Sequence, residues 1–245
     1  MDNRKINIAA VALGTALLFS LQACQQNEES AAADSPFASS HLPTDTLNVG
    51  FLAINGVYNS ELMAPFDVFQ HTVFHTTPGM KTFIVSPTHE PIKTFEGIRI
   101  IPDFSFEDTP TIDVLVVPSA EHNMDTDLQD SVLIEFVREK GTQAKFIMSL
   151  CDGAFLLAKA SLLDEVKCTT FPSDIARFKE TFPHLNVQEG YSFVHDGKAI
   201  TSSGGAKSYD PAMYLVEYLY GDKVARGIGG GLVIDWRLEE VKHLR

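Results

Sequence analysis

Short apolar runs alternate with longer amphipathic stretches from about residue 47 to residue 220 of this chain. A run of roughly four to eight Val, Ile, Leu and Phe residues is typical of a strand that is buried on both faces, and a longer amphipathic stretch is typical of a covering helix. The alternation predicts an α/β fold in which a mostly parallel central sheet is covered by helices on both faces. The predicted strands are residues 47–54, 81–86, 113–117, 145–150 and 167–169, and the predicted helices are residues 61–75, 126–140, 153–159, 173–181 and 211–220.

A β-hairpin breaks this alternation late in the chain. Residues 192–195 and 198–202 have the pattern of two strands, and the Asp196-Gly197 dipeptide between them favours a two-residue turn. We therefore expect a late hairpin in an otherwise parallel sheet, within one domain that spans residues 46–245. The hydrophobic content of 44% and the charged content of 21% are ordinary for a globular chain that buries a sizeable core.

The first residues have the pattern of a secretory signal. Arg4 and Lys5 precede an apolar stretch of 14 residues at 8–21, which is shorter than the roughly 20 residues of a spanning helix. Leu-Gln-Ala-Cys at 21–24 resembles the lipobox of bacterial lipoproteins, whose cysteine carries acyl chains such as palmitate after cleavage. We expect residues 1–23 to be the signal peptide and Cys24 to be the lipid attachment site, with an ordinary secreted protein as the alternative. By resemblance to Gram-negative sorting rules, Gln25 predicts the outer membrane, facing the periplasm.

Residues 24–45 are rich in Gln, Asn, Ser, Ala, Glu and Pro and contain few apolar residues. This composition predicts a disordered tether between Cys24 and the domain. The chain as a whole is acidic, with a formal net charge of −13 at pH 7. A surface with net negative charge does not attract nucleic acid or anionic lipid headgroups. We therefore expect no nucleic-acid partner, and membrane contact through Cys24 alone.

Cys151 follows the predicted strand at 145–150 and precedes Asp152, Gly153 and the predicted helix at 153–159. A cysteine at such a turn is held out of the core, at a helix N-terminus whose unpaired N–H groups and partial positive charge favour a thiolate. The pattern therefore predicts a nucleophile. A structural disulfide with Cys168 is the alternative in an oxidising compartment, although Cys168 lies in a short β-like run where a thiol acts as a small apolar group.

Two other segments also follow predicted strands. Ligands of open parallel sheets lie beyond the carboxyl ends of the strands, so we expect these segments to converge with Cys151 on one cleft. One segment contains Glu61 and opens the first helix, and the other is residues 118–122. A carboxyl group near a thiol can donate a hydrogen bond to the thiolate or take the thiol proton. Glu61 is the candidate for this group, and its alternative role is to favour the N-terminus of its own helix.

Three segments in this order resemble the ThiJ/PfpI family of the class I glutamine amidotransferase-like superfamily. Residues 62–69 (LMAPFDVF) resemble its opening helix, and residues 151–163 (CDGAFLLAKASLL) resemble its nucleophile elbow and following helix. Residues 201–205 with 210–217 resemble its late hairpin and closing helix. The resemblance covers about residues 47–227 and implies a flavodoxin-like three-layer sandwich that is often a homodimer. It also implies an elbow cysteine and an acidic residue from the first helix, which are Cys151 and Glu61 here.

The chain departs from the family members that act as proteases or amidotransferases. Those members have a histidine beside or near the nucleophile, whereas Asp152 follows the cysteine here and Phe171 stands where many relatives have a histidine. His122 is the histidine that follows a predicted strand near the cleft, and a solvated loop histidine is its alternative. The sequence therefore shows no evident general-base histidine.

The loop after the strand at 113–117 also departs from the family. It usually reads Pro-Gly-Gly and gives a backbone N–H to an oxyanion, but here it reads Pro118-Ser119-Ala120. A backbone donor does not need glycine unless the loop requires a positive φ angle. The N–H groups of Ser119, Ala120 and Asp152 are therefore the candidate oxyanion donors.

An elbow cysteine with an acidic first-helix residue and no nearby histidine resembles the isonitrile hydratase-like branch of the family and the amidotransferase-like halves of some transcription regulators. This branch adds water across a carbon–nitrogen triple bond to give a formamide. The resemblance implies that Cys151 attacks the carbon and that Glu61 moves the proton. We thus expect an envelope-anchored cysteine-dependent hydratase or lyase for a small electrophilic molecule. The alternative is a non-catalytic lipoprotein that binds a small molecule or senses oxidants through Cys151.

We expect neither a cofactor nor a metal ion. The glycine-rich residues 227–231 follow the last predicted helix and do not lie between a strand and a helix, so they are expected to form a flexible turn and not a phosphate loop. His71 and His75 have a spacing that can bind zinc, but no acidic or cysteine neighbour accompanies them in sequence, which favours a solvated helix face. Residues 236–241 have the pattern of a short amphipathic segment that packs on the domain or on a dimer partner.

Overall fold

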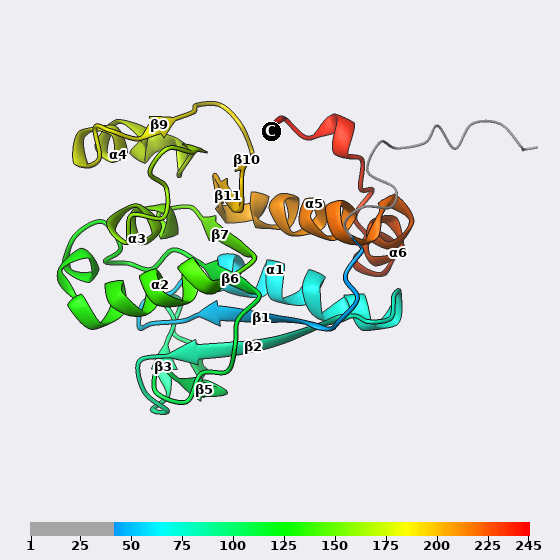
Figure 1. Cartoon of the computed structure of the whole chain (residues 1–245), viewed down its shortest axis with the longest axis horizontal. Helices are drawn as coiled ribbons and strands as arrows, with labels where there is room; N and C mark the ends of the chain where they lie inside the picture. The colour runs from blue at the N-terminus through cyan, green and yellow to red at the C-terminus, as the bar shows by residue number, and fades with distance from the viewer. Residues whose placement is uncertain (1–41) are drawn as a thin grey trace, which may run out of the picture. The chain divides into compact units, whose positions relative to one another are not determined.

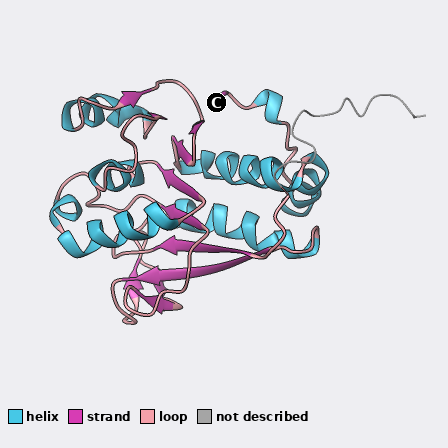
Figure 2. Ribbon diagram, viewed as in Figure 1, coloured by secondary structure: helices cyan, strands magenta, loops and turns pink. Residues whose placement is uncertain are grey.

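A computed structural model of the chain describes residues 42–245. The expected signal peptide, the lipid attachment site Cys24 and the tether up to residue 41 lie outside the described residues. In the described part, an eight-stranded sheet lies between helices (Figure 1). Figure 2 shows the strands in magenta and the helices around them in cyan. Among residues 42–245, none of the helices has the length and apolar content needed to cross a membrane.

The strand order of the large sheet is β12-β10-β11-β7-β6-β1-β2-β5. All neighbouring pairs from β11 to β5 are parallel, whereas β10 runs antiparallel to β11 and β12 runs parallel to β10. The expected α/β class, the mostly parallel sheet and the late hairpin are therefore confirmed. The strands are β1 (Leu47–Leu52), β2 (Met80–Ser86), β5 (Phe104–Ser105), β6 (Val114–Val117), β7 (Phe146–Leu150), β10 (Phe193–Asp196), β11 (Ala199–Ser202) and β12 (His243–Leu244).

Two short strand pairs lie outside the large sheet. One pair is β3 (Ile92–Lys93) with β4 (Arg99–Ile100), and the other is β8 (Lys167–Cys168) with β9 (Asn186–Val187). The predicted strand at 167–169 thus exists in part, but it pairs with β9 and not with the large sheet. Its Thr169 N–H instead donates to the side chain of Thr201, at 2.8 Å.

The six α-helices within residues 42–245 form two layers. Their bounds are α1 (Asn59–His71), α2 (Ser131–Gln143), α3 (Gly153–Lys159), α4 (Ile175–Thr181), α5 (Tyr209–Tyr220) and α6 (Asp222–Leu232). Successive side chains of a strand point to opposite faces of the sheet, so each face builds its own apolar core. In β6, Val114 and Val116 pack with residues of α1, α5 and α6, whereas Leu115 and Val117 pack with residues of α2, α3 and α4. The expected three-layer sandwich is therefore present, and Figure 1 shows α5 and α6 (orange) side by side in one of the layers.

Two of the predicted helices, residues 126–140 and 173–181, begin with a 3-10 turn and not with α-helix. Residues 126–129 form such a turn, and α2 starts only at Ser131 because the Asp130 side chain caps it. The Asp130 carboxylate accepts the N–H groups of Val132 and Leu133, both at 3.0 Å. An aspartate in this position satisfies N–H groups that have no partner within the helix.

The prediction of a flexible turn at residues 227–231 is wrong, because these residues lie within α6. Glycine lowers helix propensity by about 1 kcal/mol per residue relative to alanine, so the sequence pattern does not reveal this helix. Tertiary packing explains two of these glycines, Gly227 and Gly229, whereas a Cβ on Gly230 or Gly231 would meet nothing within 4 Å. A Cβ on Gly227 would lie 2.6 Å from His75 Nδ1, and one on Gly229 would lie 2.7 Å from the carbonyl oxygen of Ile234.

Residues 236–241 were expected to pack on the domain or on a dimer partner. In this structure the C-terminal segment packs on the domain. Trp236 is buried, and its Nε1 donates to the Glu217 carboxylate at 2.6 Å. The chain then ends by adding β12 to the sheet beside β10.

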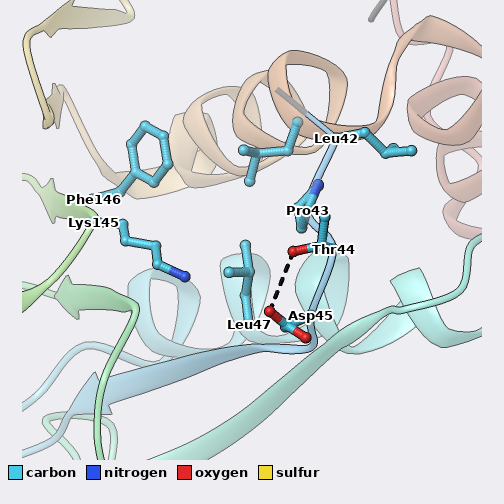
Figure 3. A pocket seen from close by; sticks show the side chains of 8 residues that line it. Leu42, Pro43, Thr44, Asp45, Leu47, Lys145 and Phe146 are labelled. Atoms are coloured by element: carbon cyan, nitrogen blue, oxygen red, sulfur yellow. Dashed lines mark hydrogen bonds between the residues drawn. The ribbon is translucent and has the colours of Figure 1, made fainter. Parts of the chain in front are cut away.

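A hollow of about 330 Å³ lies at the amino ends of β1 and β7, where the described chain enters the domain (Figure 3). Lys145 at its edge forms an ion pair with Asp113, at 2.9 Å. Thr44 donates to Asp45 at 3.2 Å in the entering segment. Because Cys151 follows the carboxyl end of β7, this hollow lies at the end of the strand opposite to the expected functional edge.

Candidate active site

Cys151 connects β7 to α3 with a φ angle of 52°. A positive φ is uncommon for a residue other than glycine, and a strained turn between a strand and a helix is how a nucleophile elbow is built. Two hydrogen bonds hold the turn in place. The Cys151 N–H donates to the Ser202 carbonyl of β11 at 3.0 Å, and the Cys151 carbonyl accepts the Thr170 hydroxyl at 3.0 Å.

Two glycines make room for this elbow. A Cβ on Gly153 would lie 2.0 Å from the carbonyl oxygen of Val117, so α3 can approach β6 only with glycine there. Gly204 has a φ angle of +70°, and a Cβ on it would lie 2.4 Å from the Cβ of Cys151. The loop after β11 therefore covers the cysteine at close range.

Glu61 of α1 is fixed by two loops that follow strands. Its Oε2 accepts the N–H of Ser119 after β6, and its Oε1 accepts the N–H of Gly205 after β11, both at 3.0 Å. Glu61 is 4% exposed, and burial raises the pKa of its carboxyl group. Hydrogen bonds from Gly205, Ser119 and the Cys151 thiol oppose this rise in pKa. The structure thus brings Glu61 and Cys151 together, as the sequence predicted.

The expectation that Cys151 is held out of the core as a thiolate is wrong. The residue is 7% exposed, and burial raises the pKa of its thiol, as do the carboxyl groups of Glu61 and Asp152. A helix N-terminus contributes about 0.3–1 kcal/mol, which is less than one pKa unit. Burial can shift a pKa by about 3–5 units, so it outweighs the helix. Cys151 is therefore a protonated thiol at neutral pH, and it needs a base to become a nucleophile.

The side chain of Asp152 lies against the same thiol. The Cys151 Sγ donates to Asp152 Oδ2 at 3.6 Å. The Thr170 hydroxyl shares its one hydrogen between the Cys151 carbonyl, at 3.0 Å, and Asp152 Oδ1, at 3.3 Å. Asp152 is 7% exposed. Burial and the nearby Asp174 carboxylate raise the pKa of the Asp152 carboxyl to about 6. Two buried carboxyl groups with raised pKa values thus flank one thiol.

The three candidate oxyanion donors differ in availability. The Ser119 N–H is engaged by Glu61, and the Ala120 N–H donates to Asn123 Oδ1 at 2.6 Å. The Asp152 N–H hydrogen-bonds the Cys151 sulfur, which lowers the pKa of the thiol. The expectation of free donors at Ser119 and Ala120 therefore does not hold in this structure, and Asp152 is the candidate that lies at the reacting atom.

The disulfide alternative is also wrong, because Cys151 and Cys168 are both free thiols. Cys168 is fully buried, and burial raises the pKa of its thiol to about 12. His122 is a solvated loop histidine, which was the alternative expectation for this residue. Its side chain is 54% exposed and lies beside Asp125. Among the described residues there is no group of three or more His, Cys, Asp and Glu that can hold a metal ion.

Sequence reasoning missed Thr170, Gly205 and Tyr58 as parts of the site. Thr170 follows a short predicted strand, and Gly205 lies in a quoted motif, so their position after strands was the available signal. Tyr58 carried no such signal. Burial raises the pKa of its hydroxyl, and the charge that Cys151 carries as a thiolate raises it further, which places Tyr58 within electrostatic range of the thiol.

A second hollow, of about 300 Å³, lies beyond the carboxyl ends of β1 and β2. Asn55, Ser86 and His122 are among its lining residues, together with Asp127, whose pKa is raised by burial. Its position agrees with the general rule that ligands of parallel sheets bind at this edge. The described residues therefore offer space for a small ligand at the expected edge of the sheet.

Comparison with known proteins agrees with this geometry. A protein-family model described as DJ-1/PfpI family matches residues 48–217. Isonitrile hydratase from Pseudomonas putida is 27% identical over 181 residues, which cover 74% of this chain and 75% of that protein. The HTH-type transcriptional regulator GbdR from Pseudomonas aeruginosa is 26% identical over 61% of this chain and 40% of its own length. The crystal structure of a ThiJ/PfpI family protein from Pseudomonas syringae is similar in fold, with a TM-score of 0.69 at 22% identity, over 86% of this chain and 84% of that chain.

Proposed function

This chain belongs to the DJ-1/PfpI family, and we propose that it is a cysteine-dependent hydratase or lyase for a small electrophilic molecule, with isonitriles as the substrate class. One observation carries the proposal. Cys151 stands on a strained elbow, and the carboxyl group of Glu61 is locked beside its thiol by two backbone N–H groups. The similarity to isonitrile hydratase over 74% of this chain supports the substrate class.

The proposed reaction adds water to R–N≡C in two stages. In the first stage, the Cys151 sulfur bonds the terminal carbon, its proton passes to a carboxyl group, and the carbon gains a proton. The product is a thioimidate, in which the former triple bond has become C=N. In the second stage, water adds across C=N, the C–S bond breaks, and the sulfur regains a proton as the formamide leaves. Atoms balance, because water is the one molecule consumed besides the isonitrile.

Glu61 has the properties that proton delivery to the carbon requires. Its raised pKa keeps it protonated over a wider pH range than an ordinary glutamate, and its two backbone contacts fix its orientation. The Asp152 N–H at the sulfur can stabilise negative charge that develops there.

The test is turnover of a panel of alkyl and aryl isonitriles by the full chain, with the formamide measured by mass spectrometry. We expect formamide from the wild type, and at least a hundredfold loss in Cys151→Ala. The matched control is Cys168→Ala, which removes the other described thiol and is expected to retain turnover. Formamide production that survives in Cys151→Ala, or that no isonitrile supports in the wild type, contradicts the proposal.

The alternative proposal is a non-catalytic small-molecule-binding protein, which the hollow beyond β1 and β2 favours because Cys151 is not among its lining residues. This alternative predicts ligand binding that is equally tight in Cys151→Ala and yields no product. Redox sensing is less well supported, because the raised thiol pKa of Cys151 lowers the thiolate fraction that oxidants attack.

We also propose that Cys24 anchors the chain to the outer membrane, facing the periplasm. The support is the Leu-Gln-Ala-Cys sequence with the charged and apolar segments before it. Labelling of cells with a palmitate analogue tests this proposal: the wild type is expected to carry the label and Cys24→Ser is expected to lose it. A homodimer, which the family resemblance implies, is tested by sedimentation.

A further inference from the structure

The two carboxyl groups beside Cys151 differ in what their oxygens contact. Both oxygens of Glu61 accept backbone N–H groups. Asp152 instead has one oxygen held by the Thr170 hydroxyl, while its Oδ2 accepts the thiol itself, 3.6 Å from Sγ. Besides its contact with Glu61, the thiol therefore has Asp152 Oδ2 as an acceptor, and this oxygen accepts no backbone N–H.

The groups that face Asp152 are acidic or weakly acidic. Glu61 approaches from α1, Asp174 from the turn before α4, Cys151 from the elbow itself, and Tyr58 from the loop before α1. A general base works best when its pKa lies near the working pH, because it is then ionised yet still holds a proton well. With its pKa raised to about 6, Asp152 is ionised at pH 7 and is more basic than an ordinary aspartate.

We propose that the side-chain carboxylate of Asp152 is a second catalytic group, the base that takes the proton of the Cys151 thiol. This inference rests on the proposed function and assigns the two carboxyl groups different tasks. In the first stage, which requires Asp152 ionised and Glu61 protonated, the proton moves from Sγ to Asp152 Oδ2, the sulfur electron pair bonds the carbon, and Glu61 gives its proton to the carbon.

The second stage restores both groups. Glu61 takes a proton from the water that adds to the carbon, and Asp152 gives its proton to the nitrogen. When the C–S bond breaks, the hydroxyl proton of the adduct passes through Asp152 to the sulfur. The site ends as it began, with the thiol restored and each carboxyl group returned to the protonation state in which it entered the first stage. With two carboxyl groups, one can hold the thiol proton while the other delivers a proton to the carbon.

The pH dependence of Cys151 alkylation tests this assignment without a substrate. Iodoacetamide reacts with the full chain at pH 5 to 9, and mass spectrometry of the Cys151 peptide gives the rate. The sulfur bonds carbon, iodide leaves, and the thiol proton passes to Asp152 and then to solvent. If Asp152 is the base, the logarithm of the wild-type rate rises with pH to an inflection near pH 6, levels off, and rises again as the thiol ionises unaided.

Two variants separate a base from a mere nearby charge. Asp152→Asn is expected to remove the inflection, which leaves a rate that rises tenfold per pH unit. Asp174→Asn leaves the Asp152 carboxyl in place but removes a neighbouring carboxylate that raises the pKa of Asp152. This variant is therefore expected to move the inflection to lower pH. The Asp174 variant tests the assignment even if the Asp152 variant fails to fold.

The outcomes distinguish the inference from the function beneath it. The assignment is overturned if the inflection survives in Asp152→Asn. It is also overturned if the profile of this variant keeps its shape and only moves to higher rates at every pH. In both cases, isonitrile turnover by the wild type would still support the function. A native Cys151 that iodoacetamide does not modify at any pH overturns the assignment, whereas the absence of formamide from every isonitrile overturns the function.

Discussion

The Glu61 carboxylate accepts the backbone N–H of Gly205, 144 residues further along the chain, with an Oε1···N distance of 3.0 Å. This contact ties the start of α1 to the loop that covers Cys151 after β11. The other oxygen of Glu61 accepts the Ser119 N–H, which ties the loop after β6 to the same side chain. Two loops at the carboxyl edge of the sheet and the first turn of α1 thus meet at one buried side chain, which positions the site and stabilises the fold around it.

Replacing Glu61 by Gln should therefore destabilise the chain. A glutamine amide has one carbonyl oxygen, so its NH2 group faces one of the two N–H donors and leaves a buried donor unsatisfied. We expect a loss of about 1–3 kcal/mol in the free energy of unfolding, measured by urea denaturation. Glu121→Gln is the matched control, because that carboxyl is exposed. Equal stability of the two variants would show that Glu61 is not clamped in this way.

Gly204→Ala should be much more damaging than Gly205→Ala. Both residues have positive φ angles, but only at Gly204 would the new Cβ meet Cys151, at 2.4 Å, whereas nothing lies within 4 Å at Gly205. The positive φ alone costs on the order of 1–3 kcal/mol for alanine, and the clash adds strain of about 1–3 kcal/mol. Urea denaturation of both variants gives the comparison. The account of the covering loop would be wrong if the two variants lost the same stability.

Asp152 should make the stability of the chain depend on pH. Its folded pKa, about 6, lies above the ordinary 3.8, so the folded state holds the proton more tightly than the unfolded state. The stabilisation is complete below about pH 4 and is lost as the pH rises towards 6. The shift of about two units corresponds to on the order of 3 kcal/mol. Relative to wild type, Asp152→Asn should therefore gain up to that amount between pH 4 and pH 7 in urea denaturation. A stability difference that does not change with pH contradicts the raised pKa.

Thr170→Val should raise the pKa of Asp152 further, because the lost hydroxyl donates to the carboxylate and so lowers that pKa. Thr170→Ser keeps the hydroxyl and is expected to behave like the wild type. The measurement is the pH at which the Cys151 alkylation rate inflects, which should move above 6 in the valine variant. A serine variant that shifts as far as the valine variant would show that the hydroxyl is not the cause.

Much of the fold followed from local sequence signals. Residues 153–159 were predicted as a helix with the same bounds as α3, because Gly153 marks its start and an apolar run follows. The helix at 222–232 was missed, since its glycines argue against a helix locally and its stability comes from packing against α5 and His75. Local propensity does not contain such tertiary contacts.

The site was predictable in its members but not in its electrostatics. Residues that follow strands gave Cys151, Glu61 and the Ser119 loop, because parallel strands bring these positions to one edge. The sequence alone could not show that Gly204 and Thr170 bury the thiol, or that Glu61 engages the Ser119 N–H. These contacts reverse the expected thiol pKa, and each joins residues that are far apart in the chain.

The most direct test of the account is the selectivity of iodoacetamide for the two described thiols in the folded chain at pH 8, measured by peptide mass spectrometry. Cys151 and Cys168 are both buried and both have raised pKa values, so burial alone predicts that neither reacts. If the elbow and its two carboxyl groups present Cys151 as a nucleophile, Cys151 is modified at least tenfold faster than Cys168 before any unfolding. If Cys151 and Cys168 are modified at the same rate, and only when the chain unfolds, Cys151 is not presented as a nucleophile.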